Sequence, residues 1–288
     1  MFRLGAMTDE ISQDFEHAVS VCKEYGLQTA EIRSVRDKPP QDLSDTDIKA
    51  MKAILEEAEM TVSCIASPFY KCDLDDAAAR REHLDILRRC AALAHALGTT
   101  IVRGFTFWRP PDVEPVWTQI LDAFEEPMRI AAESEITLAI ENEAATSMAT
   151  AALLERFLRE VDHPNIKAIW DPANEVYAEG GERPYPEAFD RVQPWMVHFH
   201  LKDAVRDDEG NPKCVPIGEG AIDYPGQLKA LFESGYEGSV SLETHWRPVE
   251  LTEEQINRPG GAAFSESGEY ASRVCLDNLL RMVRRITG

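Results

Sequence analysis

Four residues with metal-binding side chains occupy corresponding places in the second half of the sequence. Each ends or directly follows a short apolar run typical of a β-strand: Glu141 in TLAIENE, Asp171 in IKAIWDP, His200 in VHFHLKD and Glu243 in SVSLETH. Three carboxylates and one imidazole form a ligand set for a hard or borderline divalent cation such as Mn²⁺, Mg²⁺, Co²⁺ or Zn²⁺. A lone strand-end glutamate is usually solvated or salt-bridged, but four such positions in consecutive units predict a metal centre.

Short strand-like runs alternate with helical patterns along the chain. The expected strands are residues 2–7, 29–35, 61–67, 100–105, 137–141, 166–171, 197–202 and 239–244. Ser44 and Asp47 form a capping box for a helix that runs to about residue 59, and Gly98 is expected to end the next helix. Eight strand–helix units in 288 residues predict an α/β fold, a single (β/α)₈ TIM barrel over residues 1–288. Such a barrel brings the C-terminal ends of its strands to one mouth.

A doubly wound open sheet is the alternative architecture. Its first turn would carry a glycine-rich dinucleotide fingerprint, but the corresponding turn here is TDEISQD, without glycine. The connections at residues 204–224 and 246–267 are longer than a barrel requires. We expect them to be lids or substrate walls, although a tolerated surface insertion also fits.

The composition narrows the choice of partners. A net charge of -21 would repel nucleic-acid phosphates and anionic membranes, so a small molecule is the expected partner. The sequence contains neither a membrane-spanning apolar run nor the apolar core of a signal peptide. Its six cysteines form no CxxC pair and no disulfide-scaffold pattern, which favours a cytoplasmic location.

These strand-end residues resemble those of the xylose isomerase-like TIM-barrel superfamily. Within it the chain is similar to the sugar phosphate isomerase/epimerase group, which includes D-tagatose and D-psicose 3-epimerases and inosose dehydratase. The resemblance implies that one Mn²⁺ or Co²⁺ is held by Glu141, Asp171, His200 and Glu243. It also implies substrate contact by Arg206, six residues after the ligand histidine, and is strengthened by the turn Gly218-Glu219-Gly220.

Other residues depart from the epimerase pattern or extend it. The epimerases have a histidine three residues after the ligand aspartate, where this chain has Asn174. Asparagine can hydrogen-bond a substrate oxygen but carries no charge. Arg103, Trp108 and Lys202 lie at or near strand ends and are expected to line a sugar pocket, although each also fits a surface or ligand-orienting role.

The expected chemistry is proton transfer beside a carbonyl. Mn²⁺ is the expected ion, and it would polarise the carbonyl of a keto sugar or polyol-derived substrate. Glu141 would then remove the neighbouring proton and Glu243 would return it through an enediolate, or the reverse. The outcome would be epimerisation or isomerisation. No phosphate cradle is evident, which favours an unphosphorylated substrate.

Three other functions are compatible with parts of the pattern. A metal-dependent lyase or dehydratase, similar to inosose dehydratase or acting on a 3-keto glycoside, would use the same ligands. A barrel that binds metal and sugar without turnover is also compatible with them. A nuclease similar to endonuclease IV is disfavoured by the acidic charge and by only seven histidines. The resemblance further implies a homo-oligomer.

Overall fold

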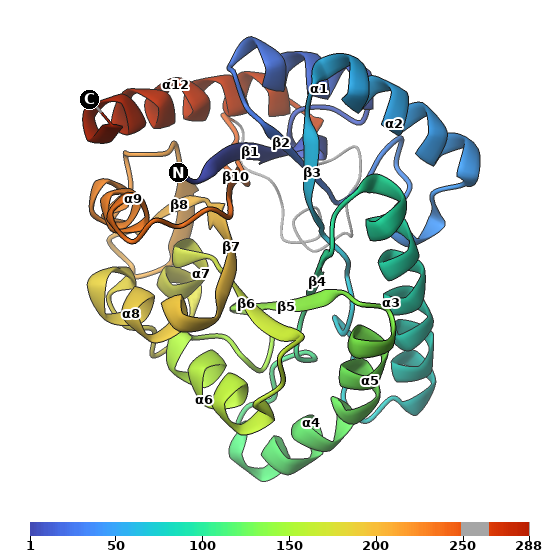
Figure 1. Ribbon diagram of the computed structural model, residues 1–288. Coiled ribbons are helices and arrows are strands. Elements are labelled where there is room, and N and C mark those ends of the chain that lie inside the picture. Colours follow the sequence, from blue (N-terminus) through green and yellow to red (C-terminus); the bar gives the residue numbers. More distant parts are fainter. Residues whose placement is uncertain (249–264, 288) are drawn as a thin grey trace.

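The protein is a closed barrel of parallel strands surrounded by helices (Figure 1). The computed structural model describes residues 1–248 and 265–287, and within them eight strands close the barrel. Their order around it is β1 (Arg3–Met7), β10 (Ser239–Leu242), β7 (Met196–Leu201), β6 (Ile166–Trp170), β5 (Thr137–Glu141), β4 (Ile101–Gly104), β3 (Thr61–Ile65) and β2 (Thr29–Ile32). Each expected strand is present, so the predicted TIM barrel is confirmed.

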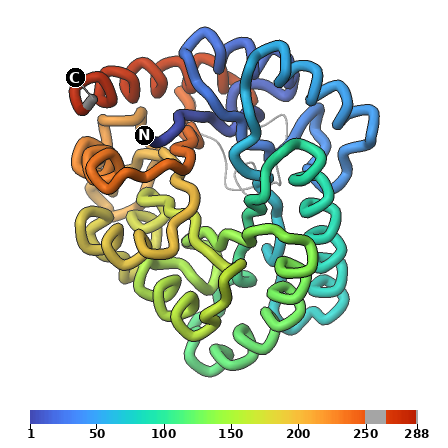
Figure 2. Tube along the Cα trace, viewed as in Figure 1, coloured from blue at the N-terminus to red at the C-terminus, as the bar shows by residue number. Residues whose placement is uncertain are grey.

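The main helices form an outer ring around these strands (Figures 1 and 2). They are α1 (Phe15–Glu24), α2 (Asp45–Ala58), α3 (Ala77–Leu97), α4 (Trp117–Ala123), α5 (Glu125–Glu133), α6 (Ala151–Val161), α8 (Phe189–Val192), α9 (Tyr224–Glu233) and α12 (Gly268–Thr287). The short α7 (Pro172–Tyr177) follows β6 and lies inside this ring beside β7 (Figure 1). The predicted capping box at Ser44 opens α2. Gly98 ends α3 in the left-handed conformation at φ 78°, as predicted.

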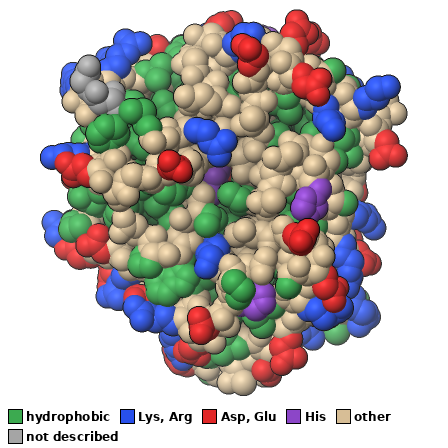
Figure 3. Space-filling view, viewed as in Figure 1, with side chains coloured by type: hydrophobic (Ala, Val, Ile, Leu, Met, Phe, Trp, Pro, Cys, Tyr) green, Lys and Arg blue, Asp and Glu red, His purple; other side chains and the backbone are tan. Residues whose placement is uncertain are grey.

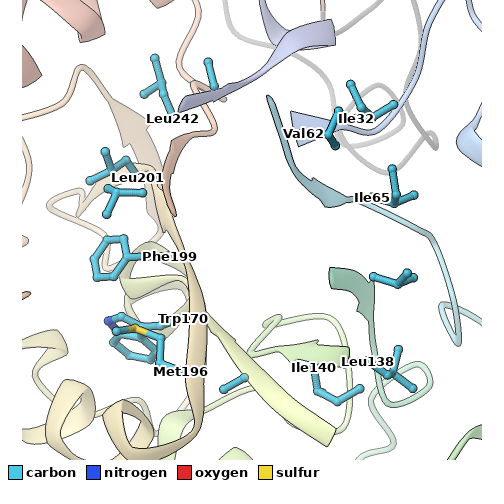
Figure 4. Close-up of a cluster of buried hydrophobic side chains, with 14 of the residues drawn as sticks. Ile32, Val62, Ile65, Leu138, Ile140, Trp170, Met196, Phe199, Leu201 and Leu242 are labelled. Atoms are coloured by element: carbon cyan, nitrogen blue, oxygen red, sulfur yellow. The ribbon is translucent and has the colours of Figure 1, made fainter. Parts of the chain in front are cut away.

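The hydrophobic core lies between the strands and the helices. Alternate strand residues face opposite sides, so Phe199 and Leu201 point outward to the core (Figure 4) while His198 and His200 point into the barrel. The apolar part of the interior is small, and includes Cys64, Ala139 and Ile169. The rest of the described interior is therefore available to polar side chains.

One long connection contains an antiparallel hairpin that the sequence analysis did not predict. In the connection expected at residues 204–224, β8 (Asp203–Arg206) pairs with β9 (Pro212–Val215), so the hairpin begins one residue earlier than the expected connection. The buried Asp203 carboxylate accepts hydrogen bonds from the backbone N–H groups of Gly218 at 2.8 Å and Gly220 at 3.1 Å. These hydrogen bonds join the first strand of the hairpin to the turn that follows its second strand. Most of the other long connection, residues 249–264, lies outside the described residues.

Two further expectations concern disulfides and membranes. All six cysteines lie in the described part of the chain and all are free thiols. Among the described residues, the helices are too short or too polar to span a membrane.

Candidate metal centre

The four predicted ligand residues meet inside the barrel mouth. Glu141 ends β5, His200 lies in β7, and Asp171 and Glu243 directly follow β6 and β10. One ligand atom from each lies within 4.8 Å of the others, and all four residues are buried. Their strand neighbours, including Ile140, Trp170, Phe199 and Leu242, pack into the outer core (Figure 4). The strand alternation thus turns the four side chains inward.

His200 lies between the two glutamates. Its Nδ1 is 3.0 Å from Oε1 of Glu141 and 3.8 Å from Oε2 of Glu243. Burial alone would lower the pKa of His200, but the carboxylates of Glu31 and Glu141 outweigh it and raise the pKa well above its ordinary value. The site therefore attracts positive charge strongly.

Asp171 is fixed by the start of α7. Its Oδ1 caps the helix by accepting hydrogen bonds from the N–H groups of Ala173 at 2.8 Å and Asn174 at 3.2 Å. The Asn142 side chain accepts a hydrogen bond from the Asp171 backbone N–H and donates one to its carbonyl. The second carboxylate oxygen, Oδ2, lies 2.8 Å from Nζ of Lys202. Burial raises the pKa of Asp171 to about 6.

Buried arginine and lysine side chains donate hydrogen bonds to the carboxylates of Glu141 and Glu243. Arg103 Nη1 donates to Oε2 of Glu141 at 3.2 Å, and Arg33 Nη1 donates to Oε1 of Glu243 at 3.3 Å. Lys202 Nζ also donates to Oε2 of Glu243 at 3.1 Å. Burial opposes ionisation of Glu243, but Lys202 and the other nearby cations hold its pKa well below the ordinary value. Glu243 is therefore ionised at neutral pH.

A second group of charged residues, which was not predicted from the sequence, lies beside the site. Arg33, just after β2, donates from Nε to Asp9 Oδ2 at 2.8 Å and from Nη2 to Glu10 Oε1 at 2.7 Å. Glu10 also accepts from Nη2 of Arg247 at 2.6 Å, and its Oε1 lies 3.1 Å from Nδ1 of His245. The strand-end criterion could have found Asp9, Glu10 and Arg33 if applied equally to the first two strands.

The residues predicted to contact substrate divide into two groups. Asn174, Arg103 and Lys202 are buried and bond to the candidate ligands; Asn174 Nδ2, for example, donates to Oε1 of Glu141 at 3.3 Å. Arg206 is exposed on β8 and donates to the carbonyls of Gly210 and Ala178. Trp108 is 37% exposed after β4. Substrate contact by these residues remains a prediction.

The charge of the cluster fits a divalent cation. A histidine that binds a metal ion is neutral, and with the histidines counted as neutral the described part of the cluster has six carboxylates and four permanent cations, an excess of two negative charges that a divalent ion would balance. The carboxylates are Asp9, Glu10, Glu31, Glu141, Asp171 and Glu243, and the cations are Arg33, Arg103, Lys202 and Arg247. An uncompensated buried charge is costly, and a cation bound by oxygen and imidazole donors would remove that cost.

Comparison with known proteins agrees with this architecture. The family model described as xylose isomerase-like TIM barrel matches residues 19–266. The chain belongs to this family.

Individual relatives of this barrel have different activities. Inosose dehydratase of Klebsiella pneumoniae (strain 342) is 28% identical over 156 residues, which are 49% of this chain and 52% of the dehydratase. The chain thus spans about half the length of this curated relative. The structure of D-allulose 3-epimerase from Methylomonas sp. in complex with D-allulose has a TM-score of 0.68 and 17% identity, and the match covers 94% of this chain and 95% of the epimerase.

A third similar structure contains a metal. A xylose isomerase-like TIM-barrel protein from Mycobacterium smegmatis in complex with magnesium has a TM-score of 0.67 and 19% identity, with 97% of this chain and 98% of that chain covered. At these identities, the two structural similarities establish the fold only.

Proposed function

We propose that this protein is a divalent-metal-dependent isomerase or epimerase that transfers a proton beside the carbonyl of an uncharged keto sugar or polyol-derived ketone. The arrangement of Glu141 and Glu243 carries this proposal. Each glutamate directs one carboxylate oxygen toward His200 and has its other oxygen held by a buried arginine, Arg103 or Arg33. Two positioned carboxylates suit removal and return of a proton.

The ligand set defines the metal part of the proposal. A divalent cation held by Glu141, Asp171, His200 and Glu243 would supply Lewis-acid polarisation of the substrate carbonyl when bound. Mn²⁺ is the ion that we expect, and the magnesium in the similar M. smegmatis structure supports testing Mg²⁺ beside it. A single divalent ion would also leave the buried cluster neutral. A neutral cluster favours an uncharged substrate over a phosphorylated one.

The two glutamates have complementary positions. Glu141 ends β5 and Glu243 follows β10, and β6 and β7 separate these strands in the barrel. Proton removal by one glutamate and return by the other can therefore use different sides of the substrate. Return to the opposite face of the same carbon inverts its configuration, and return to the adjacent carbon interconverts ketose and aldose. The surrounding cations keep Glu243 ionised, which is the form that can accept a proton, although the same cations lower its basicity.

A dehydratase is the second candidate, favoured by the similarity to inosose dehydratase. The first step would be the same removal of a proton beside the carbonyl. The electron pair of the broken C–H bond would then form a carbon–carbon double bond, and the β-hydroxyl would leave with the electron pair of its C–O bond and, after protonation, be released as water. The two reactions differ in their product, so they can be separated directly.

Hydrogen exchange in D₂O tests both candidates. Metal-loaded protein would be incubated with ketoses, keto-inositols and 3-keto glycosides, and the products followed by NMR. We expect deuterium at the carbon beside the carbonyl, and an isomerised product with no loss of water. Release of water or of an aglycone would instead assign the lyase reaction.

Two matched variants test whether the hydrogen exchange takes place at the proposed metal centre. Glu243→Gln removes one proposed acid–base group and should reduce exchange by at least about 100-fold. Glu133→Gln makes the same chemical change on the exposed end of α5 and should leave exchange unaltered. If every substrate stayed unlabelled while the metal remained bound, the catalytic proposal would be wrong.

A further inference from the structure

A buried carboxylate contacts two histidines beneath the candidate metal centre. Oε2 of Glu31 lies 2.8 Å from Nε2 of His198, and Oε1 lies 3.0 Å from Nε2 of His200. All three side chains are completely buried. Glu31 lies in β2 and the histidines in β7, with β1 and β10 between these strands. The contact therefore crosses the interior of the barrel.

These distances determine which nitrogen of each histidine carries a hydrogen. An ionised carboxylate can only accept hydrogen bonds, so both Nε2 atoms must donate to Glu31. In His200 the remaining nitrogen is Nδ1, which lies 3.0 Å from Oε1 of Glu141 and in the metal-free protein also donates a hydrogen, to that carboxylate. A bound cation would take the place of the Nδ1 hydrogen, while Nε2 keeps its hydrogen for Glu31. Nδ1 is thus the nitrogen that can serve as a ligand.

Without Glu31, the neutral imidazole would favour the other tautomer. The carboxylates of Glu141 and Glu243 lie beside Nδ1 and would attract a hydrogen to it. A protonated Nδ1 cannot bind a metal ion. An acceptor fixed at Nε2 removes this competition, because it keeps the hydrogen on the side of the ring away from the ligand cluster.

We propose that Glu31 is a positioning residue that makes Nδ1 of His200 the ligand nitrogen. The other oxygen of Glu31 lies 2.8 Å from Nε2 of His198, which is not itself a proposed ligand. This inference rests on the metal binding of the proposed function. A network that only stabilises the barrel would use the same contacts, but it would not control metal affinity separately from folding.

Two substitutions separate these roles. Glu31→Gln offers one acceptor oxygen and one donor NH₂, so both histidines can no longer donate to it from Nε2. His198→Gln retains an N–H donor toward Glu31 and leaves the contact between Glu31 and His200 in place. Both variants disturb the same buried network, which makes His198→Gln the matched control.

For the wild type and each variant, calorimetric titration would measure the affinity for Mn²⁺, and urea unfolding of the metal-free protein would measure its stability. We expect Glu31→Gln to weaken Mn²⁺ binding by about 10- to 100-fold, and His198→Gln to change it by less than about threefold, at comparable losses of stability. Equal Mn²⁺ affinity in the wild type and Glu31→Gln would overturn the inference. Failure of the wild type to bind Mn²⁺ would overturn the metal part of the proposed function itself.

A spectroscopic measurement needs no variant and applies even if Glu31→Gln does not fold. ¹¹³Cd²⁺ bound to protein with ¹⁵N-labelled histidine should show coupling to Nδ1 of His200 and a hydrogen on its Nε2. Coupling to Nε2 would contradict the proposed role of Glu31.

Discussion

Individual charged residues in the barrel mouth compensate one another. Lys202 is the clearest example, because its ammonium group lies 2.8 Å from Asp171 Oδ2 and 3.1 Å from Glu243 Oε2. Burial opposes protonation of Lys202, yet Asp171 and Glu243 raise its pKa well above the ordinary value. Lys202 thus remains charged and partly neutralises two proposed metal ligands.

Replacing Lys202 with methionine should destabilise the metal-free protein and increase the stabilisation that bound metal provides. We expect Lys202→Met to lower the free energy of unfolding of the metal-free protein by about 3–5 kcal/mol, because it removes a buried cation that contacts two buried carboxylates. Adding Mn²⁺ should raise the free energy of unfolding more in this variant than in the wild type. Urea unfolding with and without Mn²⁺ measures both effects.

Lys229→Met is the control for this prediction, since Lys229 is exposed on α9. It should change stability by less than about 0.5 kcal/mol. An equal effect of the two substitutions would show that the Lys202 ion pairs contribute little.

The sequence predicted the four candidate ligands but not the residues that hold them. Glu141, Asp171, His200 and Glu243 could be predicted because each has a ligand-type side chain at a strand end. The role of Glu31 depends on a contact across the barrel with His198 and His200. No local spacing in the chain encodes that contact, because β2 and β7 are not neighbours.

At the scale of elements, α7 connects the site to the surrounding helical layer. The helix begins beside Asp171 and carries Glu175, whose carboxylate accepts hydrogen bonds from Ala151 N–H at 2.7 Å and Glu182 N–H at 2.8 Å. Ala151 is the first residue of α6. Burial raises the pKa of Glu175 to about 7.

The raised pKa of Glu175 predicts a pH dependence of stability. Its folded pKa exceeds its unfolded value of about 4.3, so the folded protein binds the proton more tightly. The resulting stabilisation is complete below the unfolded pKa and is lost as the pH rises through about 7. The free energy of unfolding of the wild type should therefore fall between pH 5 and pH 8. In Glu175→Gln we expect this fall to be smaller by on the order of 1–3 kcal/mol.

Urea unfolding at pH 5 and pH 8 tests this prediction, with Glu179→Gln as the control in the segment after α7. The same pH dependence in the wild type and Glu175→Gln would show that Glu175 does not titrate in this range.

Most barrel elements were predictable because their signals are local. The capping box at Ser44 and the left-handed Gly98 mark helix ends within a few residues of sequence. The β8–β9 hairpin was missed because its strands have four residues each and β9 begins with Pro212. The hydrogen bonds that Gly218 and Gly220 donate to Asp203 join residues 15 and 17 positions apart, and no local turn pattern predicts them.

The whole molecule separates a charged exterior from a charged site. Acidic and basic side chains gather around the rim, over the outer helices (Figure 3). Arg129 and Glu126, which form an ion pair on α5, are one solvent-exposed example. The core between strands and helices isolates this surface from the interior cluster. Charge compensation inside the barrel therefore depends on the interior groups and on the cation that we propose they bind.

Metal binding should stabilise the entire fold, because the ligands come from four strands and converge only in the folded state. At a free Mn²⁺ concentration 100 times Kd, we expect the free energy of unfolding to rise by about 2.7 kcal/mol. A chelator should reverse this gain. Thermal unfolding of the wild type and of Asp171→Asn measures it, and an equal Mn²⁺ effect in both would place the ion elsewhere.

The most direct test of the account is a Mn²⁺ titration in D₂O in which bound metal and substrate exchange are measured in the same samples. Using a substrate identified from the panel, we predict that deuterium incorporation beside the carbonyl rises in proportion to bound Mn²⁺ and saturates at one ion per chain. Glu141→Gln should abolish the incorporation. Exchange that is independent of Mn²⁺, or absent at full occupancy, would contradict metal-dependent proton transfer at this site.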